Sequence, residues 1–148
     1  ITPYLEDVRD LAAAGAEIIA YDGTDRTRPV ASADLVAAIH EAGALAMADC
    51  SMLSDGKRAL TEGAEIIGTT LSGYTDETAT GDPGPDLDLI RQFRALGGFT
   101  MAEGRLNTPA LVTQAMRAGA DAVTVGTALT RLEVMTGWFR DAVRAGKE

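Results

Sequence analysis

The chain has 148 residues, of which 46% are hydrophobic and 24% are charged, and its formal net charge is −9. This composition is that of a globular protein, and the chain is long enough to bury a core within one domain, residues 1–148. The acidic excess argues against binding to nucleic acid or anionic lipid, so we expect neither partner. A small anionic ligand remains compatible, because local arginines and backbone N–H groups can outweigh the overall field.

Cysteine usage and hydropathy bear on the compartment. The single cysteine, Cys50, cannot form an internal disulfide, which fits a reducing environment. No apolar run approaches the roughly 18–20 residues that a membrane span needs, and no signal peptide precedes the first residue. We therefore expect a cytoplasmic protein.

A helix, a glycine and a short apolar run follow one another five times along the chain. Glycine is favoured at helix ends because it adopts the left-handed conformation that terminates them. We expect the first helix to begin with Thr2 as N-cap and Pro3 at the first helical position. The predicted helices are 2–14, 33–41, 54–62, 86–96, 108–117 and 130–145, and the predicted strands are 17–22, 44–49, 64–70, 99–104 and 120–126.

The apolar runs are continuous, as in parallel strands that are covered on both faces, and they alternate with helices. An open doubly wound sheet and a closed barrel give similar patterns. The barrel is favoured because no single switch-point crevice stands out, and because the turns 103–105 and 125–127 resemble the phosphate loops after strands seven and eight of a barrel. We predict an α/β protein: a (β/α)₈ TIM barrel, of which this chain supplies roughly strands four to eight.

A full barrel needs about 200–250 residues, so three βα units would be missing upstream. An open five-stranded sheet would leave two unpaired edges and an exposed apolar inner face. We therefore expect a homodimer, including a swapped one, or a complementing N-terminal segment. We expect Trp138 and Phe139 to pack the closing helix on the barrel.

Polar residues at the carboxyl ends of barrel strands meet at one rim, which is where such enzymes place their sites. Asp22, Asp49, Thr69, Thr70 and Glu103 occupy these positions. The two aspartates could instead cap the following helices, and both interpretations remain open. Glutamate is a poor cap, which makes Glu103 the stronger candidate for chemistry.

The last two turns have the residue types that bind phosphate. Gly104 and Arg105 combine backbone N–H groups with a guanidinium just before a helix N-terminus, where the helix dipole attracts anions. Gly126 and Thr127 offer a second set of N–H groups, with Arg131 one turn further on. We expect the two turns to face the same rim and to hold one anionic group.

Several other sites are unsupported by the sequence. The single histidine, His40, has no spaced ligand partners, so we expect no metal site. No G-x-G-x-x-G motif follows a strand, so a dinucleotide cofactor is not expected. Cys50 has no neighbouring histidine and is interpreted as a buried small side chain. The segment 75–85 is typical of an exposed, flexible loop.

Six strings resemble one family closely. They are Ile-Thr-Pro at 1–3, Met-Ala-Asp-Cys-Ser at 47–51, Gly-Thr-Thr-Leu-Ser-Gly-Tyr-Thr at 68–75, Ala-Glu-Gly-Arg at 102–105, Asn-Thr-Pro at 107–109 and Val-Gly-Thr-Ala-Leu-Thr-Arg at 125–131. Together they are similar to bacterial N-acetylmannosamine-6-phosphate 2-epimerase, an enzyme of sialic-acid catabolism, over essentially the whole chain. The resemblance implies interconversion of N-acetylmannosamine 6-phosphate and N-acetylglucosamine 6-phosphate without metal or nucleotide.

The resemblance also implies roles for particular residues. Proton removal and return at C2 needs a base, stabilisation of the enolate charge on the C1 oxygen and a phosphate clamp. Glu103 would pair with the catalytic lysine, Asp49 and Arg131 would line the substrate pocket, and Gly104, Arg105, Gly126 and Thr127 would hold the phosphate side. In the family the lysine lies upstream of the position of Ile1.

The chain departs from the family pattern in its lysines. Lys57 and Lys147 are its only lysines, and neither follows a strand. We therefore expect little or no epimerase activity from these residues alone. Two other functions stay open: another phosphate-binding barrel isomerase, against which the strings at 71–75 and 102–105 count, and a non-catalytic phosphosugar-binding module.

Overall fold

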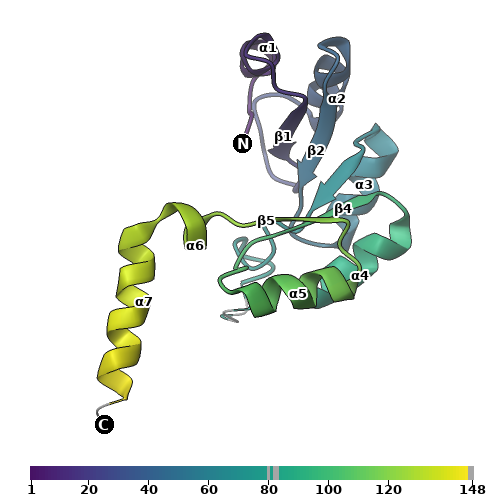
Figure 1. The fold of residues 1–148 in the computed structure, drawn as a ribbon. Coiled ribbons are helices and arrows are strands. Elements are labelled where there is room, and N and C mark those ends of the chain that lie inside the picture. The colour runs from purple at the N-terminus through teal and green to yellow at the C-terminus, as the bar shows by residue number, and fades with distance from the viewer. Residues whose placement is uncertain (80, 82–83, 147–148) are drawn as a thin grey trace.

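The computed structural model describes residues 1–79, 81 and 84–146. Its strands form one parallel sheet in the order β1-β2-β3-β4-β5 (Figure 1). The strands are β1 (Ile18–Asp22), β2 (Leu45–Asp49), β3 (Ile66–Gly68), β4 (Phe99–Glu103) and β5 (Ala122–Thr124). The helices are α1 (Leu5–Ala13), α2 (Ser32–Glu41), α3 (Leu53–Glu62), α4 (Leu87–Leu96), α5 (Pro109–Ala118), α6 (Thr127–Thr130) and α7 (Leu132–Ala145).

The order of the strands separates the two predicted architectures. A doubly wound sheet reverses its strand order, which places helices on both faces. Here each strand pairs with the next one along the chain, and neighbouring helices from α1 through to α5 pack against each other in sequence order. Right-handed crossovers in an unreversed order place these helices on the same face. The fold is an open segment of a TIM barrel, as the sequence predicted.

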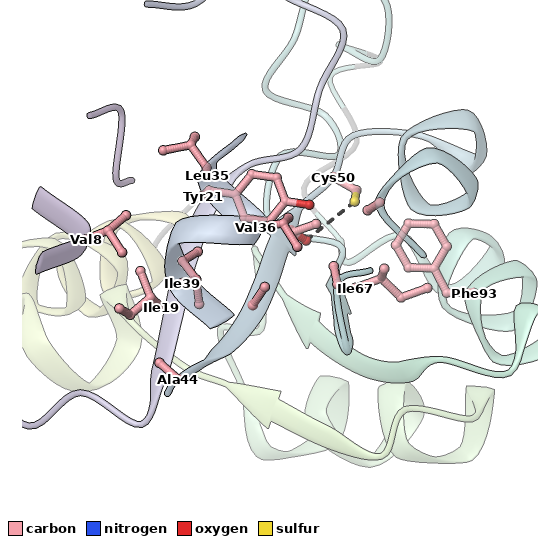
Figure 2. Close-up of a cluster of buried hydrophobic side chains, with 14 of the residues drawn as sticks. Val8, Ile19, Tyr21, Leu35, Val36, Ile39, Ala44, Cys50, Ile67 and Phe93 are labelled. Carbon is pink, nitrogen blue, oxygen red and sulfur yellow. Dashed lines mark hydrogen bonds between the residues drawn. The ribbon is translucent and has the colours of Figure 1, made fainter. Parts of the chain in front are cut away.

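The core lies between the sheet and this helical layer. Figure 2 shows side chains from β1, including Ile19 and Tyr21, meeting Val8 of α1 and Leu35 and Ile39 of α2. All five are at most 2% exposed. A second buried cluster continues the layer under α4 and α5. Both clusters use alternate strand residues, because successive side chains point to opposite faces of a sheet.

The opposite face of the sheet is apolar and open. Ile18, Leu45 and Phe99 alternate with buried neighbours and remain 47%, 46% and 44% exposed. They occupy the inner face of the barrel segment, which the sequence predicted to be uncovered. The sheet ends in β1 and β5, and among the described residues no further strand pairs with either.

Two helix ends illustrate how local chemistry sets the boundaries. At the start of α5, the Thr108 hydroxyl accepts a hydrogen bond from the Leu111 N–H at 3.3 Å, and Pro109 follows it, as predicted. The predicted start of the first helix is wrong. Thr2 is buried, and its N–H bonds to the Ala20 carbonyl at 3.2 Å, so the chain stays extended beside β1 until α1 begins at Leu5.

Helix α7 extends away from the rest of the molecule (Figure 1). Among the described residues its principal contacts are with α6. The prediction that Trp138 and Phe139 pack this helix on the barrel is wrong for this chain, because Phe139 is 69% exposed and Trp138 is 39% exposed. Helix α7 does carry the predicted apolar stripe, but this stripe is largely exposed.

The predicted loop at 75–85 is only partly described. Residues 80 and 82–83 lie outside the described residues. Within 75–79 the chain is anchored, because Thr75 is buried and the Thr78 hydroxyl accepts a hydrogen bond from the Gly73 N–H at 2.9 Å. Across the described chain, no helix combines the length and apolarity needed to cross a membrane.

The packing of α3 against α4 gives a test of the core. A Cβ added to Gly56 in α3 would lie 2.7 Å from the ring of the buried Phe93, whereas one added to Gly137 in α7 would meet nothing within 4 Å. Alanine normally favours a helix over glycine. We expect Gly56→Ala to lower the free energy of unfolding by about 1–3 kcal/mol through overpacking, while Gly137→Ala does not lower it. Urea denaturation measures both, and equal or greater stability of Gly56→Ala would contradict the described packing.

Candidate functional site

The polar ends of the strands lie at one rim of the sheet. The register pairs Asp22 with Asp49 and Glu103 with Thr124. Because all the strands are parallel, their carboxyl ends lie at the same edge. Three segments meet there: the end of β2, the turn after β3 and the end of β4.

The turns after β4 and β5 line the same cavity, which has a volume of about 210 Å³. Glu103, Gly104 and Arg105 come from the first turn, and Gly126 and Thr127 come from the second. Helix α6 begins at Thr127, and the first N–H groups of a helix have no partner within it. The structure therefore brings five of the seven predicted site residues to one cavity wall.

Arg105 connects this cavity to the loop after β3. Its Nε donates to the Gly84 carbonyl and its Nη1 donates to the Ser72 carbonyl. Its guanidinium carbon also lies 5.3 Å from the centroid of the Tyr74 ring, a favourable cation–π distance. The backbone of Arg105 is left-handed, with φ of 57°. Arg105 thus orders the loop and places a positive charge at the cavity.

Asp49 and Glu103 approach each other through Thr70. The Thr70 hydroxyl donates to Asp49 Oδ1 at 2.6 Å and lies 3.3 Å from Glu103 Oε2. Burial raises the pKa of Asp49, and the charge of Asp22 adds to this, while the hydrogen bond from Thr70 opposes it. Burial also raises the pKa of Glu103, and repulsion by Asp49 adds to it, while the contact with the Thr70 hydroxyl opposes it. Two carboxyl groups with raised pKa values form a site suited to acid–base chemistry.

The open question of helix capping is resolved by neighbouring residues. Asp55, not Asp49, satisfies the start of α3, because its Oδ2 accepts from the Ser51 and Met52 N–H groups at 2.9 and 3.2 Å. Asp22 has a local role. Its Oδ1 accepts from the Thr24 N–H at 2.9 Å, and its Oδ2 pairs with Arg26. Burial alone would raise the pKa of Asp22, but these bonds and the Arg26 charge lower it.

Some predicted residues lie away from the cavity. Arg131 is at the junction of α6 and α7, where its Nε pairs with Glu133 Oε1 at 2.8 Å and its side chain is 61% exposed. It does not line the cavity, because α7 extends away from the sheet. Lys57 is exposed on α3, and Lys147 lies outside the described residues. Within the described residues, no group of His, Cys, Asp or Glu is arranged to hold a metal ion.

The structure adds residues that the sequence did not single out for this cavity. Tyr74, Asn107 and Thr124 line it. Thr124 could have been found from the sequence, because it lies two residues before Gly126. In the structure it pairs in register with Glu103. Tyr74 and Asn107 come from loops, whose paths no periodicity predicts.

The buried carboxyl group of Asp49 makes a test of stability against pH. Its pKa is raised above the ordinary value of 3.8, so the folded state holds this proton more tightly than the unfolded chain. The resulting loss of stability is absent below the unfolded pKa and grows as the pH rises through the folded pKa. We expect Asp49→Asn to be more stable than the natural chain near neutral pH by about 1 kcal/mol.

Chemical denaturation between about pH 4 and pH 8 measures this difference, which should shrink toward the acid end. Asp25→Asn, at an exposed position, is the control and should show no comparable trend. A stability gain for Asp49→Asn that is larger in acid than at neutral pH would contradict the burial of an ionisable group.

Comparisons with known proteins agree with this geometry. A family model described as "Putative N-acetylmannosamine-6-phosphate epimerase" matches residues 1–145. A relative from Actinobacillus pleuropneumoniae serotype 5b, named "Putative N-acetylmannosamine-6-phosphate 2-epimerase", is 52% identical over 147 residues, which are 99% of this chain and 63% of that protein. The "Bifunctional enzyme NanE/NanK" of Brucella melitensis is 56% identical over 145 residues, 98% of this chain and 28% of that protein.

A solved structure gives the same result. The N-acetylmannosamine-6-phosphate 2-epimerase from Clostridium perfringens superposes with a TM-score of 0.91 and 39% identity, covering 96% of this chain and 63% of that one. The chain thus spans less than two thirds of the length of these relatives. From the family match and these identities, the chain belongs to the N-acetylmannosamine-6-phosphate epimerase family.

Proposed function

We propose that this chain forms the phosphate-binding and acidic part of an epimerase that interconverts N-acetylmannosamine 6-phosphate and N-acetylglucosamine 6-phosphate. One observation carries the proposal: the turns after β4 and β5 share a cavity with Glu103 at its edge. The N–H groups of Gly126 and Thr127 and the guanidinium of Arg105 would hold the phosphate. The sugar would then extend toward the carboxyl groups.

The reaction would pass through an enolate, since C2 carries the acetamido nitrogen and C1 the carbonyl oxygen. With the sugar ring open, the C2 proton lies next to the C1 carbonyl and can be removed by a base, and its return to the opposite face inverts C2. Glu103 and Asp49 would supply the acidic partners at the rim. Family resemblance assigns the base to a lysine, and the described cavity wall includes no lysine. We therefore propose that the base comes from residues beyond these 148.

We also propose how the molecule is completed and in which compartment it lies. The exposed inner-face residues Ile18, Leu45 and Phe99 and the apolar stripe of α7 support a molecule completed either by a complementing N-terminal segment or by a second copy in a homodimer. The buried thiol of Cys50 agrees with a cytoplasmic location.

Turnover tests this proposal. We expect the 148-residue chain to show little or no interconversion of the two sugar phosphates, as followed by ¹H NMR. The chain joined to the part of the Actinobacillus pleuropneumoniae relative that the match leaves out should be active. In that protein Glu103→Gln should slow turnover by about a hundredfold or more, since positioned acid–base groups contribute this much.

The matched control is Glu17→Gln, which changes an exposed glutamate just before β1, at the opposite end of the strand from the rim, and should leave turnover unchanged. Equal rates for the chain alone and the joined protein would refute an external base. A folded joined protein with no turnover would refute the epimerase assignment.

A further inference from the structure

Among the described residues, Thr70 is the side chain whose hydroxyl lies close to the carboxyl groups of both Asp49 and Glu103. Its hydroxyl lies 2.6 Å from Asp49 Oδ1 and 3.3 Å from Glu103 Oε2. The position is fixed by its neighbour, because the Thr69 hydroxyl donates to the Glu103 carbonyl at 2.9 Å and accepts from the Glu103 N–H at 3.1 Å. This pair of bonds ties the end of β3 to the end of β4 beside Thr70.

A hydroxyl group has one proton to donate. The 2.6 Å contact has the length of a hydrogen bond to an ionised carboxylate, whereas 3.3 Å is long for any O–H···O bond. The Thr70 proton is therefore committed to Asp49. Glu103 Oε2 faces the remaining lone pairs of the hydroxyl, so a good contact there requires a proton on Glu103 itself.

Charges around the rim act on both carboxyl groups. The charge of Asp22 raises the pKa of Asp49, and the hydrogen bond from Thr70 opposes this by favouring the ionised form. Asp49 in turn is the charged group that acts on Glu103, and an ionised Asp49 makes a second negative charge costly. Arg105 is turned toward the Ser72 and Gly84 carbonyls.

We propose that Thr70 is a positioning residue that fixes the order of ionisation at the rim, so that Asp49 is the ionised member and Glu103 retains the last proton. Thr70 then donates to Asp49 at 2.6 Å, and a protonated Glu103 faces the lone pairs of the Thr70 hydroxyl at 3.3 Å. Glu103 becomes the group that exchanges a proton or accepts a neighbouring cation, and Asp49 remains a fixed negative charge.

The catalytic meaning of this order rests on the proposed function, but the order itself does not. In an epimerase it would leave Glu103, at the cavity, as the adjustable group next to the base. In the isolated chain it is a property of three side chains and can be measured without any sugar.

The test is a pH titration of the 148-residue chain by ¹³C NMR of its carboxyl groups, with resonances assigned by Asp49→Asn and Glu103→Gln. We expect Asp49 to ionise at lower pH than Glu103. In Thr70→Val the Asp49 midpoint should move upward and the order should be lost or reversed. Thr70→Ser, which keeps the hydroxyl, should restore the natural order.

Thr124→Val is the matched control, because it removes a hydroxyl from the same cavity wall that donates to the Met101 sulfur at 3.3 Å. It should leave both carboxyl titrations unchanged. If Thr70→Val does not fold, Thr70→Ala is judged by the same criterion. Unchanged titrations in the folded Thr70 variant, or failure of Thr70→Ser to restore the order, would overturn the proposal. An inactive joined protein would leave these titrations standing, which separates this failure from that of the proposed function.

Discussion

The whole arrangement depends on the parallel pairing of consecutive strands in an unreversed order. Each crossover then passes on the same side, so the helices cover one face and the carboxyl ends of all five strands reach one rim. This constraint places the turn after β4 next to the turn after β5, although 21 residues lie between Gly104 and Gly126 along the chain. Every proposed role at the cavity follows from that placement.

The rim buries an ionisable carboxyl group, whereas the inner face of the sheet leaves apolar side chains exposed. Asp49 is 4% exposed and yet keeps an ionisable carboxyl group, which is destabilising unless a hydroxyl donor is supplied. Thr70 supplies it, and the clamp formed by Thr69 holds that donor in place. On the inner face, Ile18, Leu45 and Phe99 remain uncovered. The rim and the helical layer are thus well packed, whereas the inner face of the sheet is an apolar surface that further protein structure could cover.

Much of this could be predicted from the sequence, because glycine-terminated helices alternating with apolar runs leave few topologies. The cavity turns at Gly104 and Gly126 were predicted for the same reason. The positions of Arg131 and Trp138 were not predicted correctly, since both depend on where α7 lies. The apolar stripe of α7 indicates that it packs against something, but it does not indicate against what. Nor could the role of Thr70 be derived, because it depends on a difference between two oxygen–oxygen distances.

The central claim is that the turns after β4 and β5 bind one phosphate together. The most direct measurement is a series of ¹H–¹⁵N correlation spectra of the chain titrated with N-acetylglucosamine 6-phosphate, with N-acetylglucosamine as the control. The account predicts that the amide signals of Gly104, Gly126 and Thr127 shift together along one binding curve, and only with the phosphorylated sugar. Shifts confined to one turn, or centred on the larger cavity of about 410 Å³ at the start of α4, would contradict it.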